Sequence, residues 1–147
     1  MAVEPSHHDG MDDTTATGEL LELSVEQCER LLEKLPIGRV GFSYAGKQVV
    51  LPVNYRFLDG EIIFRTLFGQ KLDAAAAELP VAFEVDEWDE QSHSGWSVLV
   101  KGRAEQILEY DALVVADEIG ARPWAGGASE GHWVRVVPEE ITGRWLA

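Results

Sequence analysis

The first regular pattern along the chain is helical and spans residues 24–36. Apolar side chains recur there at intervals of three and four residues, which places them on one face of a helix. These are Val25, Cys28, Leu31, Leu32 and Leu35. Ser24 and Gln27 have the spacing of a capping box, and Pro36 ends the helix. Because Cys28 lies on the apolar face, we expect a small core residue and not a nucleophile.

Beyond residue 37 the period changes from helical to alternating. Short segments with apolar residues at every second position predict β-strands. The predicted strands cover residues 38–44, 48–57, 61–66, 81–88, 96–108, 132–138 and 141–146. The sequences AGK and LDGE supply turn signals between the first three of them. The pattern therefore predicts hairpins joining short antiparallel strands.

Two residues, Pro52 and Gly102, predict irregularities in these strands. Pro52 suits a strand edge or a bulge because it has no N–H to donate to a central ladder. Gly102 marks a point where a long strand bends. Residues 70–79 and 109–120 have helical patterns, and residues 121–131 form a loop. The prediction is an α+β domain with short peripheral helices around an antiparallel barrel of six to seven strands.

The chain of 147 residues is the size of one domain, and its net charge is −14. Nucleic acid and anionic membrane surfaces both need a basic face, so we expect neither as a partner. Residues 1–19 are acidic and lack apolar periodicity, which predicts a disordered tail ahead of a domain at 20–147. The start does not resemble a signal peptide, and a single cysteine agrees with a reducing cytosol, so we expect a cytoplasmic protein.

Cations gather where the third predicted strand meets the alanine-rich helix. Arg65 ends that strand and Lys71 begins the helix, although helix starts favour acidic residues. A guanidinium, an ammonium, the Thr66 hydroxyl and the amides of the first helical turn together suit a phosphate. The alternative is that Arg65 pairs with Asp73 or Glu61, and Lys71 with another acid, as surface ion pairs of little energy.

Other candidate chemistry is weak. The sequence lacks the glycine-rich fingerprints of nucleotide-binding folds and the common spacings of nucleophilic or zinc sites. Several acidic residues lie along one predicted strand and the loop that follows it. This arrangement favours a solvated face over a pair of catalytic carboxylates. Its members are Glu84, Asp86, Glu87, Asp89 and Glu90. For Trp88, Trp124 and Trp133, packing in the core or at an interface is favoured over stacking on a planar substrate.

Six segments, taken in order, carry a resemblance to a known family. They read LPIGRVGFS, VVLPVNYRF, DGEIIFRTLFGQKLDAAA, VAFEVDEWD, GWSVLVKGRAEQI and VRVVPEEITGRW, and the similarity covers about residues 22–147. The chain resembles the pyridoxamine 5'-phosphate oxidase-like, FMN-binding split-barrel superfamily, in its short bacterial, nitroimidazole-reductase-like branch. The resemblance implies a homodimer of split β-barrels with an FMN in each interface cleft.

The resemblance also implies which residues contact the flavin. The segment matching PVNY runs along the flavin ring, partly through backbone groups, and contributes Pro52, Val53, Asn54 and Tyr55. The segment matching FRTLFGQK holds the ribityl phosphate and contributes Arg65, Thr66, Gln70 and Lys71. Trp96 and Ser97 lie on a strand near the ring. Arg144 and Trp145 loosely match the last strand, which approaches the ring from the partner subunit in larger relatives.

Two departures from the family pattern narrow the expected activity. Many nitroimidazole-reductase-like members have histidine where this chain has Arg65, which argues against nitro reduction through that histidine and adds a cation for the phosphate. Longer relatives bind pyridoxamine phosphate with an extended, basic C-terminus that this chain lacks, so oxidation of that substrate is not expected.

The resemblance thus implies an FMN-dependent oxidoreductase that passes electrons from a nicotinamide cofactor to a small unknown substrate. A non-enzymatic flavin- or haem-binding module and a deazaflavin-dependent reductase remain alternatives. The oligoglutamate tail of a deazaflavin needs a basic channel. The net charge of the chain argues against such a channel, although Lys101, Arg103 and Arg135 offer a local cluster of cations. For haem, His93 and His132 are the histidines outside the tail, and each is better interpreted as a solvated loop residue.

Overall fold

The computed structural model describes residues 20–66, 77–108 and 132–147, which form seven strands and one helix. In chain order these are β1 (Leu20–Glu22), α1 (Val25–Leu32), β2 (Ile37–Tyr44), β3 (Lys47–Leu58), β4 (Glu61–Thr66), β5 (Pro80–Asp89), β6 (Ser94–Gln106) and β7 (His132–Leu146). The tail expected at 1–19, most of the helix expected at 70–79 and the whole helix expected at 109–120 lie outside the described residues.

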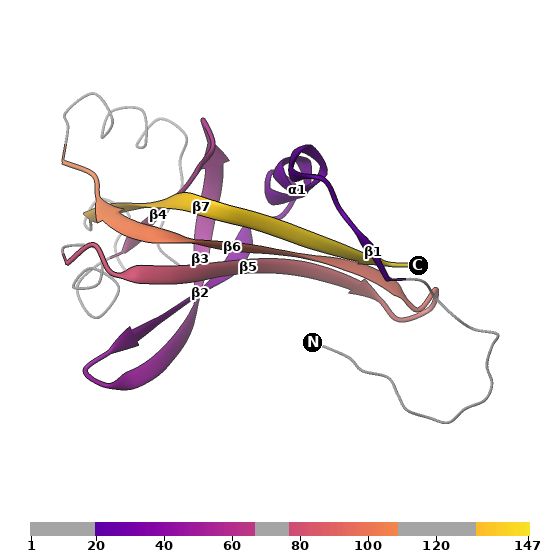
Figure 1. Cartoon of the computed structure of the whole chain (residues 1–147), viewed down its shortest axis with the longest axis horizontal. Helices are drawn as coiled ribbons and strands as arrows, with labels where there is room; N and C mark the ends of the chain where they lie inside the picture. The colour runs from indigo at the N-terminus through magenta and orange to yellow at the C-terminus, as the bar shows by residue number, and fades with distance from the viewer. Residues whose placement is uncertain (1–19, 67–76, 109–131) are drawn as a thin grey trace.

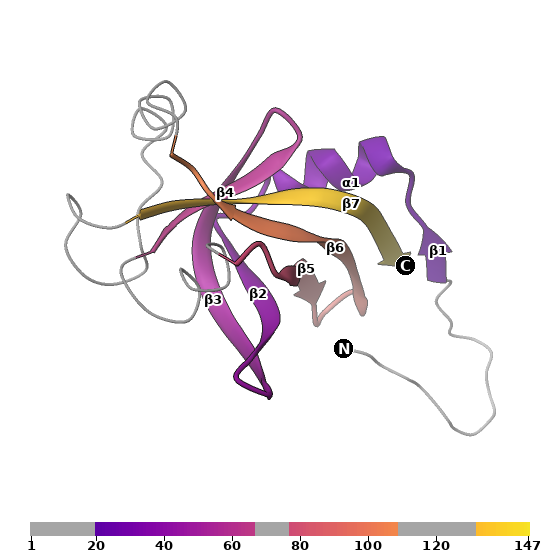
Figure 2. The same cartoon turned by 60° about the vertical axis from the view of Figure 1, so that its left-hand side comes forward.

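The strands form one antiparallel sheet that closes on itself. Their order is β1-β7-β4-β3-β2-β5-β6, and β6 also pairs with β7. In Figures 1 and 2, β5, β6 and β7 run side by side, the β2–β3 hairpin crosses them, and α1 lies beside β7. The α+β barrel predicted from the sequence is therefore confirmed for the described part of the chain.

The helix begins and packs as the sequence predicts. The Ser24 side chain accepts from the Gln27 N–H, and the Gln27 side chain accepts from the Ser24 N–H, which completes the capping box. Cys28 and Leu32 are fully buried against the sheet. Burial raises the pKa of the Cys28 thiol, as expected for a core cysteine and not for a nucleophile. Val25, at the helix start, is 52% exposed and lies outside this contact.

The two hairpins around β3 have the turn type that suits twisted strands. Ala45 and Gly46 have φ values of 53° and 76°, and Asp59 and Gly60 have values of 53° and 78°. Positive φ at both central residues defines the type I′ turn, which matches the right-handed twist of the flanking strands. The first turn pairs Tyr44 with Lys47 and sets the register of β2 on β3, and the second pairs Leu58 with Glu61 and sets the register of β4 on β3.

The largest difference from the predicted strands concerns β7. Two closing strands are expected at 132–138 and 141–146, but the structure has one continuous strand. The break in pattern is instead a bulge, because β6 and β7 shift register between Lys101 and Gly102. Gly102, where a bend was predicted, lies so close to the Val137 carbonyl oxygen that a Cβ atom would collide with it. The short β1, which pairs with the end of β7, is an element that the pattern does not predict.

Pro52 lies in the middle of β3 but not in a central ladder. It pairs with Arg39 of β2 on one side. Among the described residues, β4 pairs only with Tyr55 to Leu58 of β3, so the other side of Pro52 has no ladder partner there. The predicted edge position of Pro52 is therefore confirmed.

Candidate functional site

Alternation along β3 divides the PVNY segment between the two faces of the barrel wall. Val53 and Tyr55 point into the barrel and are buried, whereas Pro52 is exposed and Asn54 is half-buried on the outer face. The Tyr55 hydroxyl donates to the Leu32 carbonyl at 2.6 Å, and burial raises the pKa of this phenol. Neither of these two side chains can therefore contact a ligand on the outer face, and the Tyr55 N–H already donates to the Pro36 carbonyl at 3.1 Å.

The edge of β3 opposite β2 could give a ligand on the outer face backbone groups to bind. In the described part of the chain, residues 47–54 pair with β2 alone, because the β4 ladder begins at Tyr55. A strand edge without a ladder partner presents N–H donors and C=O acceptors in a row. Pro52 interrupts that row because it lacks the N–H.

β4 separates Arg65 from Thr66 by the same alternation. Ile62, Phe64 and Thr66 are buried inside the barrel, and Arg65 lies on the outer face together with Ile63, which is 7% exposed, as the sequence predicts for the alternation. Arg65 is paired in register with Trp133 of β7. The guanidinium carbon of Arg65 lies 4.8 Å from the centroid of the Trp133 ring, which is itself 3% exposed. This is a cation–π contact with a desolvated ring.

Of the other predicted phosphate ligands, the structure places only Thr66. Gln70 and Lys71 lie outside the described residues, although they follow Thr66 closely in the chain. The hydroxyl of Thr66 is on the inner side of β4, so Arg65 and Thr66 do not share a face.

Trp96, Ser97 and Arg144 lie at the other end of β7. Trp96 is 7% exposed and donates from Nε1 to Glu87 at 3.2 Å, so its side chain packs inside the barrel. Ser97 faces outward and is paired with Asp86 on one side and Arg144 on the other. The structure thus brings Ser97 and Arg144 together but leaves Trp96 on the inner face.

Opposed residues on neighbouring strands share a face, as do residues two apart on one strand, so the outward residues can be followed around the barrel from Arg65, which lies just beyond the last β3–β4 pair. We name this row the outer belt. It consists of Arg65, Asn54, Pro52, Arg39, Glu84, Asp86, Ser97 and Arg144. Its two ends, Arg65 and Arg144, lie at opposite ends of β7. Most of the predicted side chains that face outward therefore belong to one band on the barrel surface.

The middle of the outer belt contains three residues that were not predicted as part of a site. Arg39 Nη1 lies 3.1 Å from Glu84 Oε1 and 3.4 Å from Asp86 Oδ2. Burial, and then the hydrogen bond to Asp86, raise the pKa of Glu84 to about 7. Glu84 and Asp86 thus differ from the solvated face expected for the acidic group. The sequence places Arg39 on the outer face of one strand and Glu84 and Asp86 on the outer face of another. It does not show that these two strands are neighbours.

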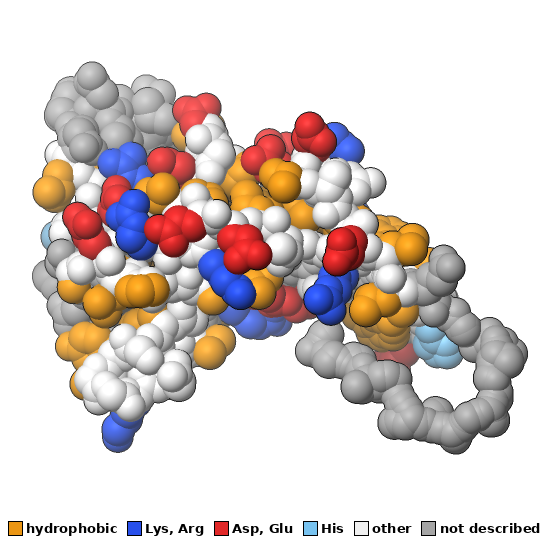
Figure 3. All heavy atoms as spheres, in the orientation of Figure 1, with side chains coloured by type: hydrophobic (Ala, Val, Ile, Leu, Met, Phe, Trp, Pro, Cys, Tyr) orange, Lys and Arg blue, Asp and Glu red, His pale blue; other side chains and the backbone are white. Residues whose placement is uncertain are grey.

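A second charged cluster covers the outer face of β6 and β7 (Figure 3). Arg103 contacts Glu105 and Glu139, each at 3.0 Å. Arg135 contacts Glu61 at 3.5 Å and Glu105 at 3.3 Å. Lys101 is paired in register with Glu140. The three cations proposed as a basic channel for a deazaflavin tail thus lie among carboxylates, which argues against that channel.

Haem, metal and membrane features find little support in the described residues. His132 begins β7 and shares a side-chain hydrogen bond of 3.3 Å with Gln106, and His93 lies in the β5–β6 turn. Within residues 20–66, 77–108 and 132–147 no three His, Cys, Asp or Glu side chains gather as metal ligands would. The same residues include no helix with the length and apolar character needed to cross a membrane.

Six strands closed by the β6–β7 pairing, with β1 and α1 beside them, define a split β-barrel. The family model described as pyridoxamine 5'-phosphate oxidase matches residues 24–145, and the chain belongs to this family. The family resemblance identified from the sequence is therefore confirmed.

Individual relatives agree with this assignment. The uncharacterized protein Rv0080 of Mycobacterium tuberculosis is 34% identical over 136 residues, which cover 85% of this chain and 84% of that protein. The structure of the FAD binding protein from Mycobacterium smegmatis has 34% identity and a TM-score of 0.73, and the match covers 86% of this chain and 100% of that one.

Two more distant structures share the fold alone. A proposed 5-nitroimidazole antibiotic resistance protein from Bacteroides thetaiotaomicron has 14% identity and a TM-score of 0.70, covering 96% of each chain. The FAD and heme binding protein from Mycobacterium smegmatis has 17% identity and a TM-score of 0.63, covering 84% of this chain and 72% of that one.

Proposed function

We propose that this protein binds FMN at the interface of a homodimer and acts as a flavin-dependent oxidoreductase. The observation that carries the proposal is the outer face of β3 and β4, where Arg65 lies over Trp133 next to the edge of residues 47–54, which has no ladder partner within the described strands. A relative with 34% identity is an FAD binding protein, which supports a flavin in general. FMN, and not FAD, remains our specific expectation from the sequence.

The donor set fits a flavin phosphate and ring. A guanidinium offers several N–H donors in one plane, and a phosphate accepts two of them in a bidentate contact. The edge of a flavin ring alternates hydrogen-bond donors and acceptors, which suit the backbone groups along β3. Pro52 and Asn54 point outward beside that edge and are placed to contact a planar ring.

A dimer explains why the predicted residues lie at both ends of the outer belt. The outer surface of a barrel is convex, so a planar ligand that contacts Arg65 and Asn54 cannot also reach Arg144 of the same chain. A second copy can bring its own Ser97 and Arg144 to the ring. We therefore propose that each flavin contacts Arg65 of one protomer and Arg144 of its partner.

When bound, the flavin supplies the redox chemistry, accepting a hydride from a reduced nicotinamide and passing electrons to a second, small substrate. The chain itself holds the phosphate, orients the ring along β3 and leaves one ring face for the substrates. None of these roles needs a nucleophilic side chain.

The absorption spectrum of the purified protein, followed by identification of the released cofactor, tests the proposal. We expect flavin bands and release of FMN. A sharp Soret band would assign haem, and a colourless protein that does not take up FMN on titration would overturn the proposal. Steady oxidation of a nicotinamide cofactor with a dye acceptor is expected of an enzyme. Tight flavin binding without that turnover would support a storage or sensing module instead.

The role of the phosphate is tested separately. In the double variant Arg65→Ala with Lys71→Ala, we expect FMN affinity to fall at least tenfold while riboflavin affinity stays within about twofold, because riboflavin lacks the phosphate. Equal losses for both ligands would contradict a phosphate site at these residues.

A further inference from the structure

Trp88 lies on the outer face of β5, one step beyond the outer belt. It follows Asp86 by two positions, so the two side chains share a face, and Trp88 is 54% exposed. Trp88 is paired in register with Gly95 of β6, where a Cβ atom would come within 2.6 Å of Cε3 of the indole ring. The indole is thus held against β6 without being part of the core. Of the two packing roles expected from the sequence, only an interface fits this position.

Aliphatic side chains continue this row of residues across β7 and β1. Gly95 is paired with Leu146, and Leu146 is paired with Leu20. Leu20 is 61% exposed, and Leu146 is half-buried. Leu146 follows Arg144 of the outer belt by two positions, so the row lies directly beyond that end of the belt. We name Trp88, Leu146 and Leu20 the end row.

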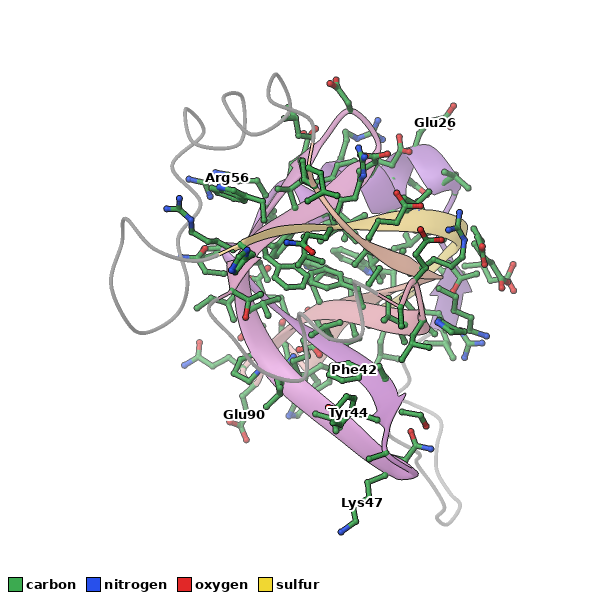
Figure 4. The ribbon with its side chains drawn as sticks, turned by 90° about the vertical axis from the view of Figure 1, so that its left-hand side faces the viewer. Glu26, Phe42, Tyr44, Lys47, Arg56 and Glu90 are labelled. Carbon is green, nitrogen blue, oxygen red and sulfur yellow. The ribbon has the colours of Figure 1, made fainter. Side chains whose placement is uncertain are left out.

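The β2–β3 hairpin presents side chains that complement the end row and the turn next to it. Val50 precedes Pro52 by two positions on the outer face of β3 and is 67% exposed. Lys47 is exposed at the tip of the hairpin (Figure 4), and among the described residues it forms no ion pair. The β5–β6 turn beside Trp88 instead carries two exposed acids, Asp89 and Glu90. One surface is therefore apolar with a cation at its end, and the other is apolar with acids at its end.

A two-fold axis brings these two surfaces together. The proposed function places Pro52 of one protomer and Arg144 of its partner at the same flavin. Four antiparallel steps separate β3 from β7 through β2, β5 and β6, so these two strands run in the same direction along the barrel wall. A two-fold rotation reverses the partner's strands, so the step from Pro52 back to Val50 meets the step from Arg144 forward to Leu146. The hairpin tip then continues toward the partner's β5–β6 turn.

We propose that the β2–β3 hairpin of each protomer packs on the partner's end row. Val50 contacts the apolar row at Leu146, and Lys47 lies beside the acids Asp89 and Glu90 of the turn. The inference rests on the proposed function, since the shared flavin sets the position of the axis. Each chain carries a net charge of −14, which opposes self-association at most orientations. Buried apolar surface stabilises this orientation, and the contact between opposite charges selects it.

Charge reversal tests the contact between the tip and the turn. Lys47→Glu places like charges together, and so does the double variant Asp89→Lys with Glu90→Lys. The contact occurs twice in a two-fold dimer, so we expect each variant to raise the dimer dissociation constant about tenfold at low ionic strength, and less at high salt. Sedimentation measures these constants. Arg30→Glu makes the same change in charge as Lys47→Glu on α1, which packs at the inner face of β7, and is the matched control with a change within about twofold.

An equimolar mixture of the two charge-reversed proteins decides whether the tip meets the turn. A heterodimer with one chain of each kind again joins opposite charges at both contacts, because one contact is the wild-type pair and the other has its signs exchanged. We expect native mass spectrometry to show mainly heterodimers, with a dissociation constant within about threefold of the wild type. A mixture that dissociates like its parents would overturn the inference, as would a Lys47→Glu dimer as tight as the wild type.

Trp88→Ser tests the apolar part of the contact. It removes the largest side chain of the end row from a position that is exposed in the single chain, so we expect the dimer dissociation constant to rise at least tenfold. An unchanged dissociation constant would overturn the role of the end row.

The wild-type protein separates failure of this inference from failure of the proposed function. If the wild type is a monomer or binds no flavin, the shared flavin site is wrong and both proposals fall. If the wild type is a flavin-binding dimer and the mixture of charge-reversed chains does not recover, only the hairpin contact is wrong.

Discussion

Glu84 shows how a local environment changes the chemistry of one residue. It lies on β5 beside Arg39 and Asp86, and burial raises its pKa from the ordinary value of 4.5 to about 7. Between these two values the folded protein keeps a proton that the unfolded chain releases. Because the folded state then binds more protons, raising the pH lowers the free energy of unfolding across this window.

The prediction is a pH-dependent difference between the wild type and Glu84→Gln, which mimics the protonated side chain. From pH 5 to pH 8 we expect the wild type to lose about 1 kcal/mol relative to the variant, a value reduced because solvent screens the half-exposed carboxyl. Urea unfolding at several pH values measures this difference. Parallel pH profiles for the two proteins would show that Glu84 titrates normally.

The hydroxyl of Tyr55 also belongs to the residue scale. It is buried and donates to the Leu32 carbonyl, which ties β3 to the end of α1. Tyr55→Phe leaves that carbonyl without this donor, so we expect a loss of about 1–2 kcal/mol in unfolding free energy. Flavin affinity in the same variant should stay within about twofold, because the hydroxyl faces the core and not the outer belt. A large loss of flavin binding with unchanged stability would place the side chain in the site instead.

At the scale of elements, the bulge between β6 and β7 depends on the missing side chain of Gly102. A Cβ there would meet the backbone of Val137, which cannot move without breaking the ladder. We expect Gly102→Ala to destabilise the protein by about 2–4 kcal/mol. Gly41→Ala in β2 is the matched control, because its Cβ would have only ordinary contacts at 3.6 Å and 3.7 Å. Equal unfolding midpoints for the two variants would contradict this role of the bulge.

Local sequence predicted well those elements whose signals are local. The capping box of α1, the hairpin turns at Gly46 and Gly60, and the alternation along β4 all depend on residues within a few positions of each other. The continuous β7 was not predicted, because the apolar alternation breaks at Pro138 and such a break is typical of a strand end. In the structure the break is a bulge in the pairing with β6, opposite Lys101 and Gly102. All three residues of the strand β1 are exposed, and it has no apolar alternation to detect.

The same distinction applies to the candidate site. The outward position of Arg65 follows from alternation in β4 alone. Its contact with Trp133 depends on β4 and β7 being neighbours, although they are far apart in the chain. The Arg39–Glu84–Asp86 contact likewise joins residues separated by 45 and 47 positions. These contacts depend on which strands are neighbours in the sheet. The alternation of residues within one strand carries no information about its neighbours.

At the scale of the whole molecule, the β2–β3 hairpin extends beyond its neighbours. β5 pairs with β2 only over Arg39–Phe42, so the described strands leave the hairpin end around Tyr44 and Lys47 uncovered. Figure 4 shows Lys47 at the tip of this arm, with Tyr44 and then Phe42 nearer the barrel. Val50 of the same arm is 67% exposed. A projecting hairpin with an exposed aliphatic side chain suits contact with a second copy of the chain.

We therefore expect the protein to form a dimer through the outer face of this hairpin, next to Pro52 and Asn54 of the outer belt. The monomer mass is 16.3 kDa, so a dimer has twice that mass in sedimentation or light scattering. Val50→Asp places a charge in the proposed interface and should weaken dimerisation by about 100-fold or more, with loss of flavin because each site needs both chains. Val25→Asp, at an exposed valine of α1 away from the hairpin, is the control and should remain a flavin-binding dimer.

A Val50→Asp protein that stays dimeric would place the interface elsewhere. A Val50→Asp monomer that binds FMN as tightly as the wild type would show that one chain completes the site.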